Sequence, residues 1–163
     1  MNKTERISTS GIHHSGLEAK SIERELRLRD QAISTSIIPI ALGDANHMVT
    51  YCNRAFLELF GVPSAELVLG RRNTEIFRTQ PTTIEEINEA MARNGSWTGE
   101  VTCLKFDGSP VDVIASGSLI FDEDKNVSGC LVSFIDVTQR NEAFDQVRQL
   151  QNEICLLYTS PSP

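Results

Sequence analysis

Residues 97–138 constrain the fold most, because their pattern is typical of three consecutive strands joined by two turns. The predicted strands cover residues 97–106, 110–121 and 127–137. Asp107, Gly108 and Ser109 form the first turn, and an Asp-Gly pair between apolar runs favours a hairpin because glycine tolerates the positive φ of a tight turn. The second turn, residues 122–126, is acidic, as expected of a solvated loop. The segment therefore predicts an antiparallel meander.

Alternation along these strands assigns their side chains to two faces, because side chains in a strand repeat every two residues. One set is apolar and small, and contains Gly99, Val101, Cys103, Val111, Val113, Ala115, Gly117, Cys130, Val132 and Phe134. The other set is mixed, and its large apolar members are Leu104, Phe106, Ile114, Leu131 and Ile135. We expect the small set to face the interior and the mixed set to be partly covered by something outside the sheet.

The chain before the meander predicts two more strands and several short helices. The strands cover residues 37–43 and 48–52, and helical turns or helices cover residues 54–60, 63–67 and 82–93, with residues 71–80 irregular or briefly helical. Asn53 is expected to cap the first of these helices and Gly61 to end it. This order predicts an α+β fold, in which a five-stranded antiparallel sheet carries short helices on one face and is flanked by amphipathic helices.

The two flanking helices are expected over residues 17–34 and 139–155. Ile22, Leu26 and Ile33 lie on the apolar stripe of the first helix. In the second, Val147, Leu150 and Ile154 belong to a 4-3-4-3 spacing typical of a short coiled coil, although an ordinary amphipathic helix fits the same pattern. The first helix is too polar to stand alone. We expect it to lie on the outer face of the sheet or against its counterpart in a second subunit.

The two ends of the chain differ from the segments beside them. Residues 1–16 are polar and rich in Ser and Thr, and are expected to be a disordered tail. Residues 156–163 are expected to break the helix, because proline cannot continue its hydrogen-bond ladder. This string resembles a non-native read-through tail appended to an incomplete reading frame.

Charge and composition argue against several functions. Asp and Glu outnumber Lys and Arg by 22 to 15, giving a formal net charge of −7. This balance argues against nucleic acid or an anionic membrane surface as a partner. No apolar run approaches the ~20 residues that span a bilayer. We therefore expect a cytoplasmic protein without membrane contact in this segment.

The four cysteines and the carboxylates show no grouping typical of catalysis or metal binding. Cys52, Cys103, Cys130 and Cys155 form no C-x-x-C pair, and are expected to be small buried hydrophobes in a reducing compartment. A thiol switch between Cys103 and Cys130, placed on neighbouring strands, is the alternative. No Ser/His/Asp or metal-ligand grouping emerges, so we expect neither catalytic residues nor a metal, and no enzyme activity in this chain.

Five stretches of the chain resemble the signatures of PAS domains. They are residues 44–56, with Asp44, Asn53, Ala55 and Phe56 at the matching positions, and residues 59–71, 95–100, 106–109 and 134–140. The resemblance agrees with the strand order derived above, and it implies a PAS domain over residues 35–138.

The resemblance implies a sensory or dimerisation module of a larger bacterial or archaeal signalling protein, such as one of a two-component system. Such modules pass a change at the sheet to a flanking helix and on to an output domain, commonly a kinase, cyclase or chemoreceptor. Asp136, Val137 and Thr138 resemble the junction at which the last strand meets the signalling helix. A homodimer through the flanking helices and a downstream effector domain in cis are the expected partners.

The resemblance also allows cofactors to be tested residue by residue. Light-oxygen-voltage photosensors carry a reactive cysteine where this chain has Asn73, and their flavin-holding amides would fall near Cys103, Val113 and Phe134. An FAD bound as in redox PAS domains would place its ring nitrogens and carbonyls near Cys103, which cannot pair with them. Each unpaired group would cost about 1–3 kcal/mol of binding free energy. Haem would need an axial histidine on the helix before the meander, and residues 82–93 contain none. We expect no cofactor, with FAD as the alternative and haem disfavoured.

An interior lined by small side chains is compatible with two structures. The residues expected to line it are Ala41, Gly43, Val101, Cys103, Val113, Ala115, Val132 and Phe134. They form either a cavity for a small, largely apolar ligand or a sheet on which helical side chains pack tightly. The alternative to a ligand-binding sensor is therefore a ligand-free PAS interaction domain with a packed core.

Overall fold

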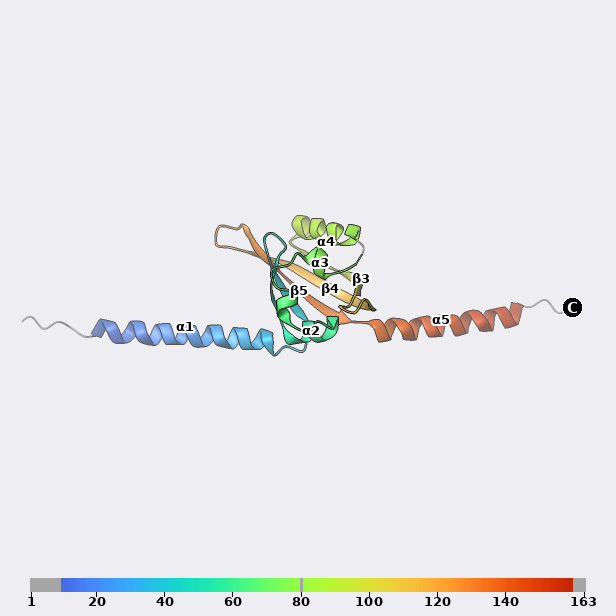
Figure 1. Cartoon of the computed structure of the whole chain (residues 1–163), viewed down its shortest axis with the longest axis horizontal. Coiled ribbons are helices and arrows are strands. Elements are labelled where there is room, and N and C mark those ends of the chain that lie inside the picture. The colour runs from blue at the N-terminus through green and yellow to red at the C-terminus, as the bar shows by residue number, and fades with distance from the viewer. Residues whose placement is uncertain (1–9, 80, 160–163) are drawn as a thin grey trace, which may run out of the picture. The chain divides into compact units, whose positions relative to one another are not determined.

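The computed structural model describes residues 10–79 and 81–159, and divides the chain into a unit that ends at Ser36 and a unit that begins at Ile37. The second unit contains all five strands, β1 (Ile40–Asp44), β2 (Val49–Cys52), β3 (Ser96–Leu104), β4 (Pro110–Phe121) and β5 (Val127–Asp136). They form one sheet in the order β2-β1-β5-β4-β3, and every neighbouring pair is antiparallel (Figure 1). The predicted fold class and the five-stranded sheet are confirmed.

The short helices lie between β2 and β3: α2 (Arg54–Phe60), the 3-10 turn η1 (Ala65–Leu67), α3 (Asn73–Ile76) and α4 (Pro81–Asn94). Asn53 caps α2, because its side chain accepts a hydrogen bond from the Phe56 N–H at 3.0 Å. Gly61 ends α2 in the left-handed conformation, with φ 63°. Both predicted ends of α2 are confirmed.

Four phenylalanines join the helices to the inner face of the sheet. Phe56 and Phe60 of α2, Phe77 after α3 and Phe134 of β5 form a cluster in which every pair of ring centroids lies 4.8–6.0 Å apart. These distances are typical of tilted and edge-to-face aromatic packing. The cluster fixes the helical layer against the sheet at one end of the interior.

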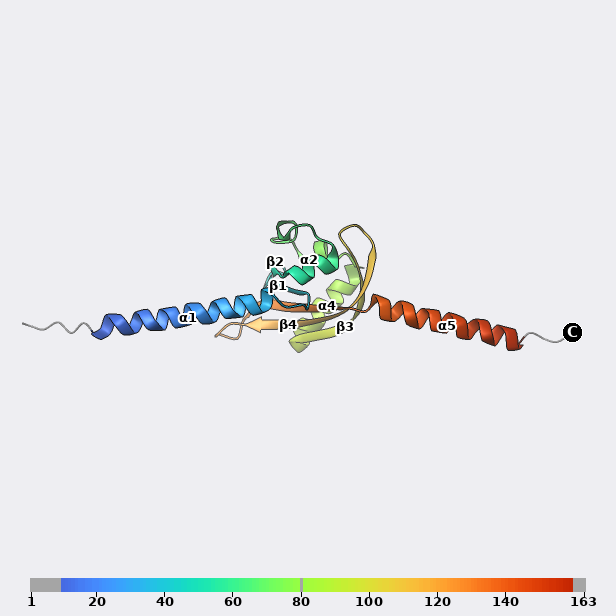
Figure 2. The ribbon, with the colours of Figure 1, turned by 90° about the horizontal axis from the view of Figure 1, so that it is seen from below.

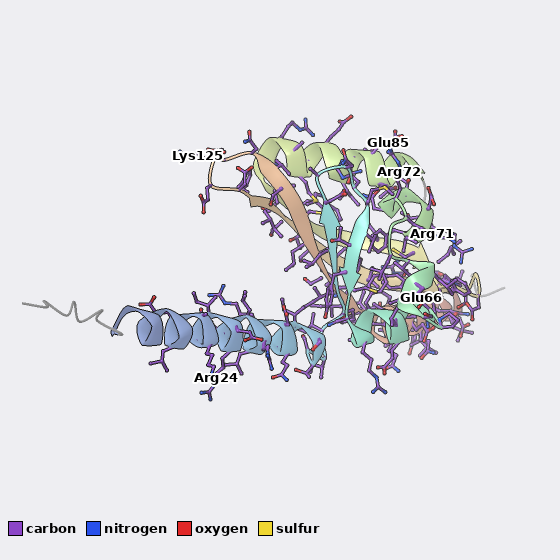
Figure 3. All side chains as sticks on the ribbon, turned by 60° about the vertical axis from the view of Figure 1, so that its left-hand side comes forward. Arg24, Glu66, Arg71, Arg72, Glu85 and Lys125 are labelled. Carbon is purple, nitrogen blue, oxygen red and sulfur yellow. The ribbon has the colours of Figure 1, made fainter. Side chains whose placement is uncertain are left out.

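The outer face of the sheet carries the mixed set of side chains. Within the chain it is only partly covered: Leu104 and Ile135 are 39% and 58% exposed, whereas Ile114 and Leu131 are half-buried. Cover from a second subunit stays a prediction. Charged side chains are distributed over the surface of each unit, such as Arg24 on α1 (Ser10–Ser34) and Lys125 at the β4–β5 turn (Figure 3).

Both flanking helices are longer than predicted. Helix α1 begins at Ser10, within the segment predicted as a tail and before the predicted helix start at residue 17, and residues 1–9 lie outside the described part of the chain. Helix α5 (Thr138–Thr159) leaves the end of β5 as one continuous helix (Figures 1 and 2) and passes the break predicted at Leu156. Residues 160–163 are not described, and the non-native origin of the tail stays a prediction.

Three smaller boundaries also differ from the predictions. Strand β1 starts at Ile40 rather than at residue 37, directly after Pro39, which has no N–H to donate to a ladder. Strand β3 ends at Leu104, because the Phe106 N–H donates to the Phe60 carbonyl instead of to β4. Helix α4 starts at Pro81, where the fixed φ of proline suits the first turn of a helix.

Candidate ligand-binding cavity

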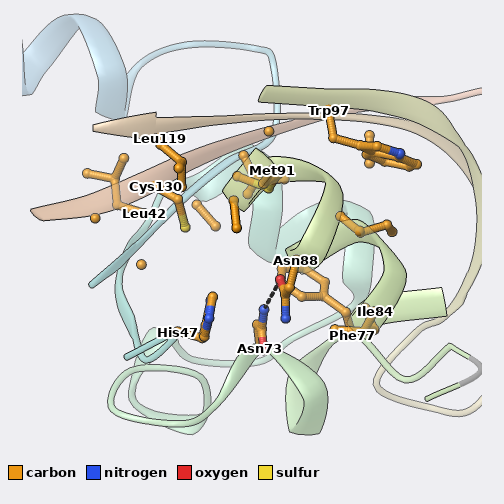
Figure 4. A pocket seen from close by; sticks show the side chains of 18 of the residues that line it. Leu42, His47, Asn73, Phe77, Ile84, Asn88, Met91, Trp97, Leu119 and Cys130 are labelled. Atoms are coloured by element: carbon orange, nitrogen blue, oxygen red, sulfur yellow. Dashed lines mark hydrogen bonds between the residues drawn. The ribbon is translucent and has the colours of Figure 1, made fainter. Parts of the chain in front are cut away.

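A cavity of about 720 Å³ lies between the inner face of the sheet and α4 (Figure 4). Ligand pockets for small molecules usually measure roughly 300–1,000 Å³. The small residues predicted for this face therefore leave space instead of allowing the helices to fill it. This space favours the cavity over the tightly packed alternative in this part of the interior, and the choice between a ligand-binding and a ligand-free domain stays a prediction.

The floor of the cavity consists largely of residues predicted from strand alternation. Seven of the eight candidates line it, namely Ala41, Gly43, Val101, Cys103, Ala115, Val132 and Phe134. The eighth, Val113, does not line it: it is fully buried in the neighbouring core with the phenylalanine cluster. Whether the seven bind a ligand stays a prediction.

Two large side chains lie directly over glycines on the inner face of the sheet. A Cβ atom at Gly117 would lie 2.8 Å from the Met91 sulfur, and one at Gly99 would lie 2.5 Å from the Trp97 ring. Met91 of α4 therefore sits directly on β4, and Trp97 lies flat on its own strand; both side chains line the cavity. Trp97 is the sole tryptophan of the chain, so its emission reports on the contents of the cavity.

One end of the cavity is polar, and sequence reasoning missed it. His47, Asn73 and Asn88 line this end, and the Asn73 Nδ2 donates to the Asn88 Oδ1 at 3.3 Å (Figure 4). The three residues come from the β1–β2 turn, α3 and α4. No local signal brings them together, because only the packing of α3 and α4 over the sheet places them side by side.

The three thiols of the interior, those of Cys52, Cys103 and Cys130, have low reactivity at neutral pH. Burial raises the pKa of Cys103 to about 11, and burial is also the main cause that raises the pKa of Cys52 and of Cys130. These thiols therefore stay protonated at neutral pH and are weak nucleophiles.

A disulfide between Cys103 and Cys130 is excluded by the topology. The prediction that they lie on neighbouring strands is wrong, because β4 runs between β3 and β5. Cys103 pairs with Val111 on one side of β4, and Cys130 pairs with Leu119 on the other. At ~3.3 Å per residue these positions are about 26 Å apart along β4, whereas a disulfide needs Cα atoms within roughly 7 Å. A thiol switch that forms a disulfide between Cys103 and Cys130 of one chain is therefore ruled out.

The Cys103 thiol predicts a pH dependence of folding. Its folded pKa is raised above the ordinary 9.0, so the unfolded chain loses this proton first and the native state loses stability between about pH 9 and pH 11. The slope from this group is up to about 1.4 kcal/mol per pH unit. Urea unfolding of wild type and Cys103→Ala at pH 7, 9 and 10 should give a stability difference that shrinks as the pH rises. Cys155→Ala, at an exposed thiol, is the control; a constant difference for Cys103→Ala contradicts the assignment.

The predicted signal junction is attached to β4 through Asp112, near the start of that strand. The Val137 N–H donates to the Asp112 carbonyl at 2.8 Å, and the Asp112 N–H donates to the Thr138 Oγ1 at 3.1 Å. At the start of α5 the Asp136 Oδ1 accepts a hydrogen bond from the Thr138 N–H at 2.9 Å, two residues on, in an Asx turn. The three junction residues thus connect the last strand, the start of α5 and β4.

A charged network on the outer face extends this attachment to β3. Arg140 and Asn141 of α5 contact the Glu100 carboxylate at 2.7 and 2.6 Å, and Asn141 also donates to Asp112 at 3.2 Å. The bonds from Asn141 and Arg140 lower the pKa of Glu100. Glu100 and Arg140 stand in motif stretches of the sequence, but their pairing across 40 residues becomes visible only in the structure.

The cavity floor does not match the flavin site that the resemblance describes. Cys103 and Phe134 face the cavity where that site would need amides, and Val113 is buried away from it. Asn73 lines the cavity at the position aligned with the reactive cysteine, so an adduct cannot form there. Among the described residues, no group of three or more His, Cys, Asp or Glu side chains could hold a metal ion.

Comparison with known proteins agrees with the fold described above. The sequence model of the PAS domain family matches residues 37–139. A phototropin-1A from Oryza sativa subsp. japonica is 27% identical over 117 residues, which are 70% of this chain but only 12% of that protein. The chain thus spans about an eighth of this curated relative.

Solved structures show the same fold. The crystal structure of a PAS domain from Colwellia psychrerythraea is 24% identical, with TM-score 0.63, and the match covers 70% of this chain and 98% of that one. An RNA-binding light-oxygen-voltage receptor is 24% identical, with TM-score 0.64, over 91% of this chain and 41% of that one. A light-oxygen-voltage domain studied with a flavin analogue is 23% identical, with TM-score 0.59, over 76% and 93%.

The chain belongs to the PAS domain family, whose members are generally sensory modules. In the described part of the chain, no helix has the length and apolar character needed to cross a membrane.

Proposed function

We propose that this PAS domain is a sensor that binds a small, largely apolar molecule between the sheet and α4, and passes the resulting change to α5. The observation that carries the proposal is the apolar cavity of about 720 Å³ over a floor of small residues. Apolar walls with a few polar groups are typical of small-molecule sites.

The strands that form the cavity floor also form hydrogen bonds with the start of α5. This supports the transmission of a ligand-induced change from the cavity to that helix. On β3, Val101 and Cys103 face the cavity, whereas Glu100 faces outward and binds Arg140 and Asn141. Because side chains alternate along a strand, a ligand that shifts the inner residues of β3 also shifts the carboxylate that holds α5.

Exposed apolar stripes on both flanking helices support a homodimer. Ile22 and Leu26 on α1, and Val147, Leu150 and Ile154 on α5, are all more than half exposed, and Ile33 is half-buried. Burial of such stripes against a second copy is favourable. We propose a cytoplasmic signalling protein, such as one of a two-component system, in which α5 drives an effector domain in cis.

The proposal is tested by removing and restoring the ligand. Protein purified natively from its own host is compared with the same protein after unfolding, solvent extraction and refolding. We expect the stripped protein to exchange amide hydrogens faster at the cavity and at residues 138–142, and to show shifted Trp97 emission. Adding the extract back restores both signals. Identical exchange and emission in all three samples would contradict the proposal.

Glu100→Ala removes the carboxylate that binds both Arg140 and Asn141. We expect amide exchange in the first turn of α5 to rise several-fold, while the free energy of unfolding changes little, because the network is exposed. Hydrogen exchange with mass spectrometry measures the first effect, and urea unfolding the second. Arg54→Ala, which removes the exposed Arg54–Glu58 pair, is the matched control; equal exchange in both variants would refute the attachment.

A further inference from the structure

The polar end of the cavity is built from two amides held by separate helices. Asn73 is fixed by its own backbone, since its N–H donates to the His47 carbonyl at 2.9 Å and its carbonyl accepts from the Phe77 N–H at 2.8 Å. Asn88 lies inside α4. Both side chains are therefore presented by hydrogen-bonded backbone, which limits their movement (Figure 4).

The Asn73–Asn88 hydrogen bond uses one half of each amide. It engages the Nδ2 of Asn73 and the Oδ1 of Asn88. Within the described part of the chain, the Oδ1 of Asn73 accepts no hydrogen bond and the Nδ2 of Asn88 donates none. The pair thus retains one acceptor and one donor at the polar end of a cavity whose other walls are mostly apolar.

We propose that Asn73 and Asn88 determine ligand specificity by binding a primary carboxamide or lactam edge on an otherwise apolar molecule. This inference rests on the proposed function of the same cavity. Such an edge carries one N–H donor beside one carbonyl acceptor, which complements the Asn88 Nδ2 and the Asn73 Oδ1. A ketone supplies only the acceptor, and a hydrocarbon supplies neither.

The apolar walls define the body of the ligand. Phe77 and Phe134 offer aromatic surface, and Ile84 and Met91 of α4 lie opposite a floor of small residues. We choose a flat two-ring hydrocarbon as the body of the probes, because the cavity of about 720 Å³ has aromatic and aliphatic walls. Suitable probes are 2-naphthamide, 2-acetylnaphthalene and 2-ethylnaphthalene, which differ only in the group offered to the polar end.

The experiment measures the affinities of the three probes, and of 2-naphthoate as an anionic comparison, by calorimetry for wild type, Asn73→Leu and Asn88→Leu. Leucine keeps the approximate shape of asparagine but cannot form hydrogen bonds. We expect the ratio of 2-naphthamide to 2-ethylnaphthalene affinity to be about tenfold or more higher for wild type than for either variant, with 2-acetylnaphthalene intermediate. Asn94→Leu, at an exposed position of the same cavity wall, is the control and should keep the wild-type ratio.

The outcomes separate this inference from the proposed function. An unchanged ratio in both leucine variants overturns the role of the asparagine pair while leaving the cavity site intact. Tighter binding of 2-naphthoate than of 2-naphthamide, unaffected by either variant, assigns recognition of the polar group to Arg93, another residue that lines the cavity, and overturns the inference. If none of the probes binds, including 2-ethylnaphthalene, the proposed function fails and the inference fails with it. Either variant suffices should the other not fold.

Discussion

Phe56→Ala lowers the free energy of unfolding by about 3–5 kcal/mol, the usual cost of emptying a buried phenylalanine site. Phe56 is 0% exposed and contacts the rings of Phe60, Phe77 and Phe134. Phe77 and Phe134 also line the cavity, so Phe56 supports the cavity wall from behind. Urea unfolding followed by circular dichroism measures the loss.

Phe106→Ala is the matched control for this variant. Phe106 is 50% exposed and belongs to none of the ring pairs of the cluster. Its substitution should cost less than about 1 kcal/mol, because little buried surface is lost. If the two variants lose similar stability, the cluster does not hold the helices on the sheet.

Asn53→Ala lowers the free energy of unfolding by about 3 kcal/mol. Asn53 is 2% exposed, and its Oδ1 accepts from the N–H groups of Phe56 and Ile40 at 3.0 and 2.9 Å, while its Nδ2 donates to the Ile38 carbonyl at 2.8 Å. Alanine removes the helix cap, at roughly 1 kcal/mol, and the two hydrogen bonds to the backbone of Ile38 and Ile40, at about 1–3 kcal/mol together. Thermal and urea unfolding measure the change.

Asn53→Ser separates the two roles of this side chain. Serine is as good a helix cap as asparagine but is too short to reach Ile38 and Ile40 as well. We expect Asn53→Ser to be more stable than Asn53→Ala by about 1 kcal/mol and less stable than wild type. A serine variant as stable as wild type would show that the bonds from Asn53 toward β1 contribute nothing.

The sheet could be predicted from the sequence because its signals are local. The Asp107-Gly108 turn, with Gly108 at φ 88°, fixes the β3–β4 hairpin, and period-two alternation then determines which side chains share a face. The same alternation identified most of the cavity floor. Alternation wrongly placed Val113 at the cavity. Val113 lies on the inner face as predicted, but whether such a residue lines the cavity or is buried in the core depends on which helix packs over it.

The ends of both flanking helices could not be predicted from composition. Helix α1 extends to Ser10 through polar residues, because adding residues to an existing helix needs no new nucleus and the propensity penalty of each is small. In α5, Leu156 continues the helix because a proline disfavours helix only for itself and the residue before it, and Pro161 lies further on.

The polar end of the cavity and the α5 attachment depend on tertiary packing. Asn73 and Asn88 are 15 residues apart, and Glu100 and Arg140 are 40 apart. Nothing in the spacing of these residues indicates contact, because neither pair shares a helix turn or a strand register.

The central claim is that the cavity holds a small molecule, and native mass spectrometry of the chain purified from its own host tests it most directly. We predict a mass above that of the polypeptide by one small, largely apolar molecule, which disappears when the same sample is denatured. A native spectrum showing only the mass of the polypeptide, with no absorption band beyond that of the protein, would contradict the claim.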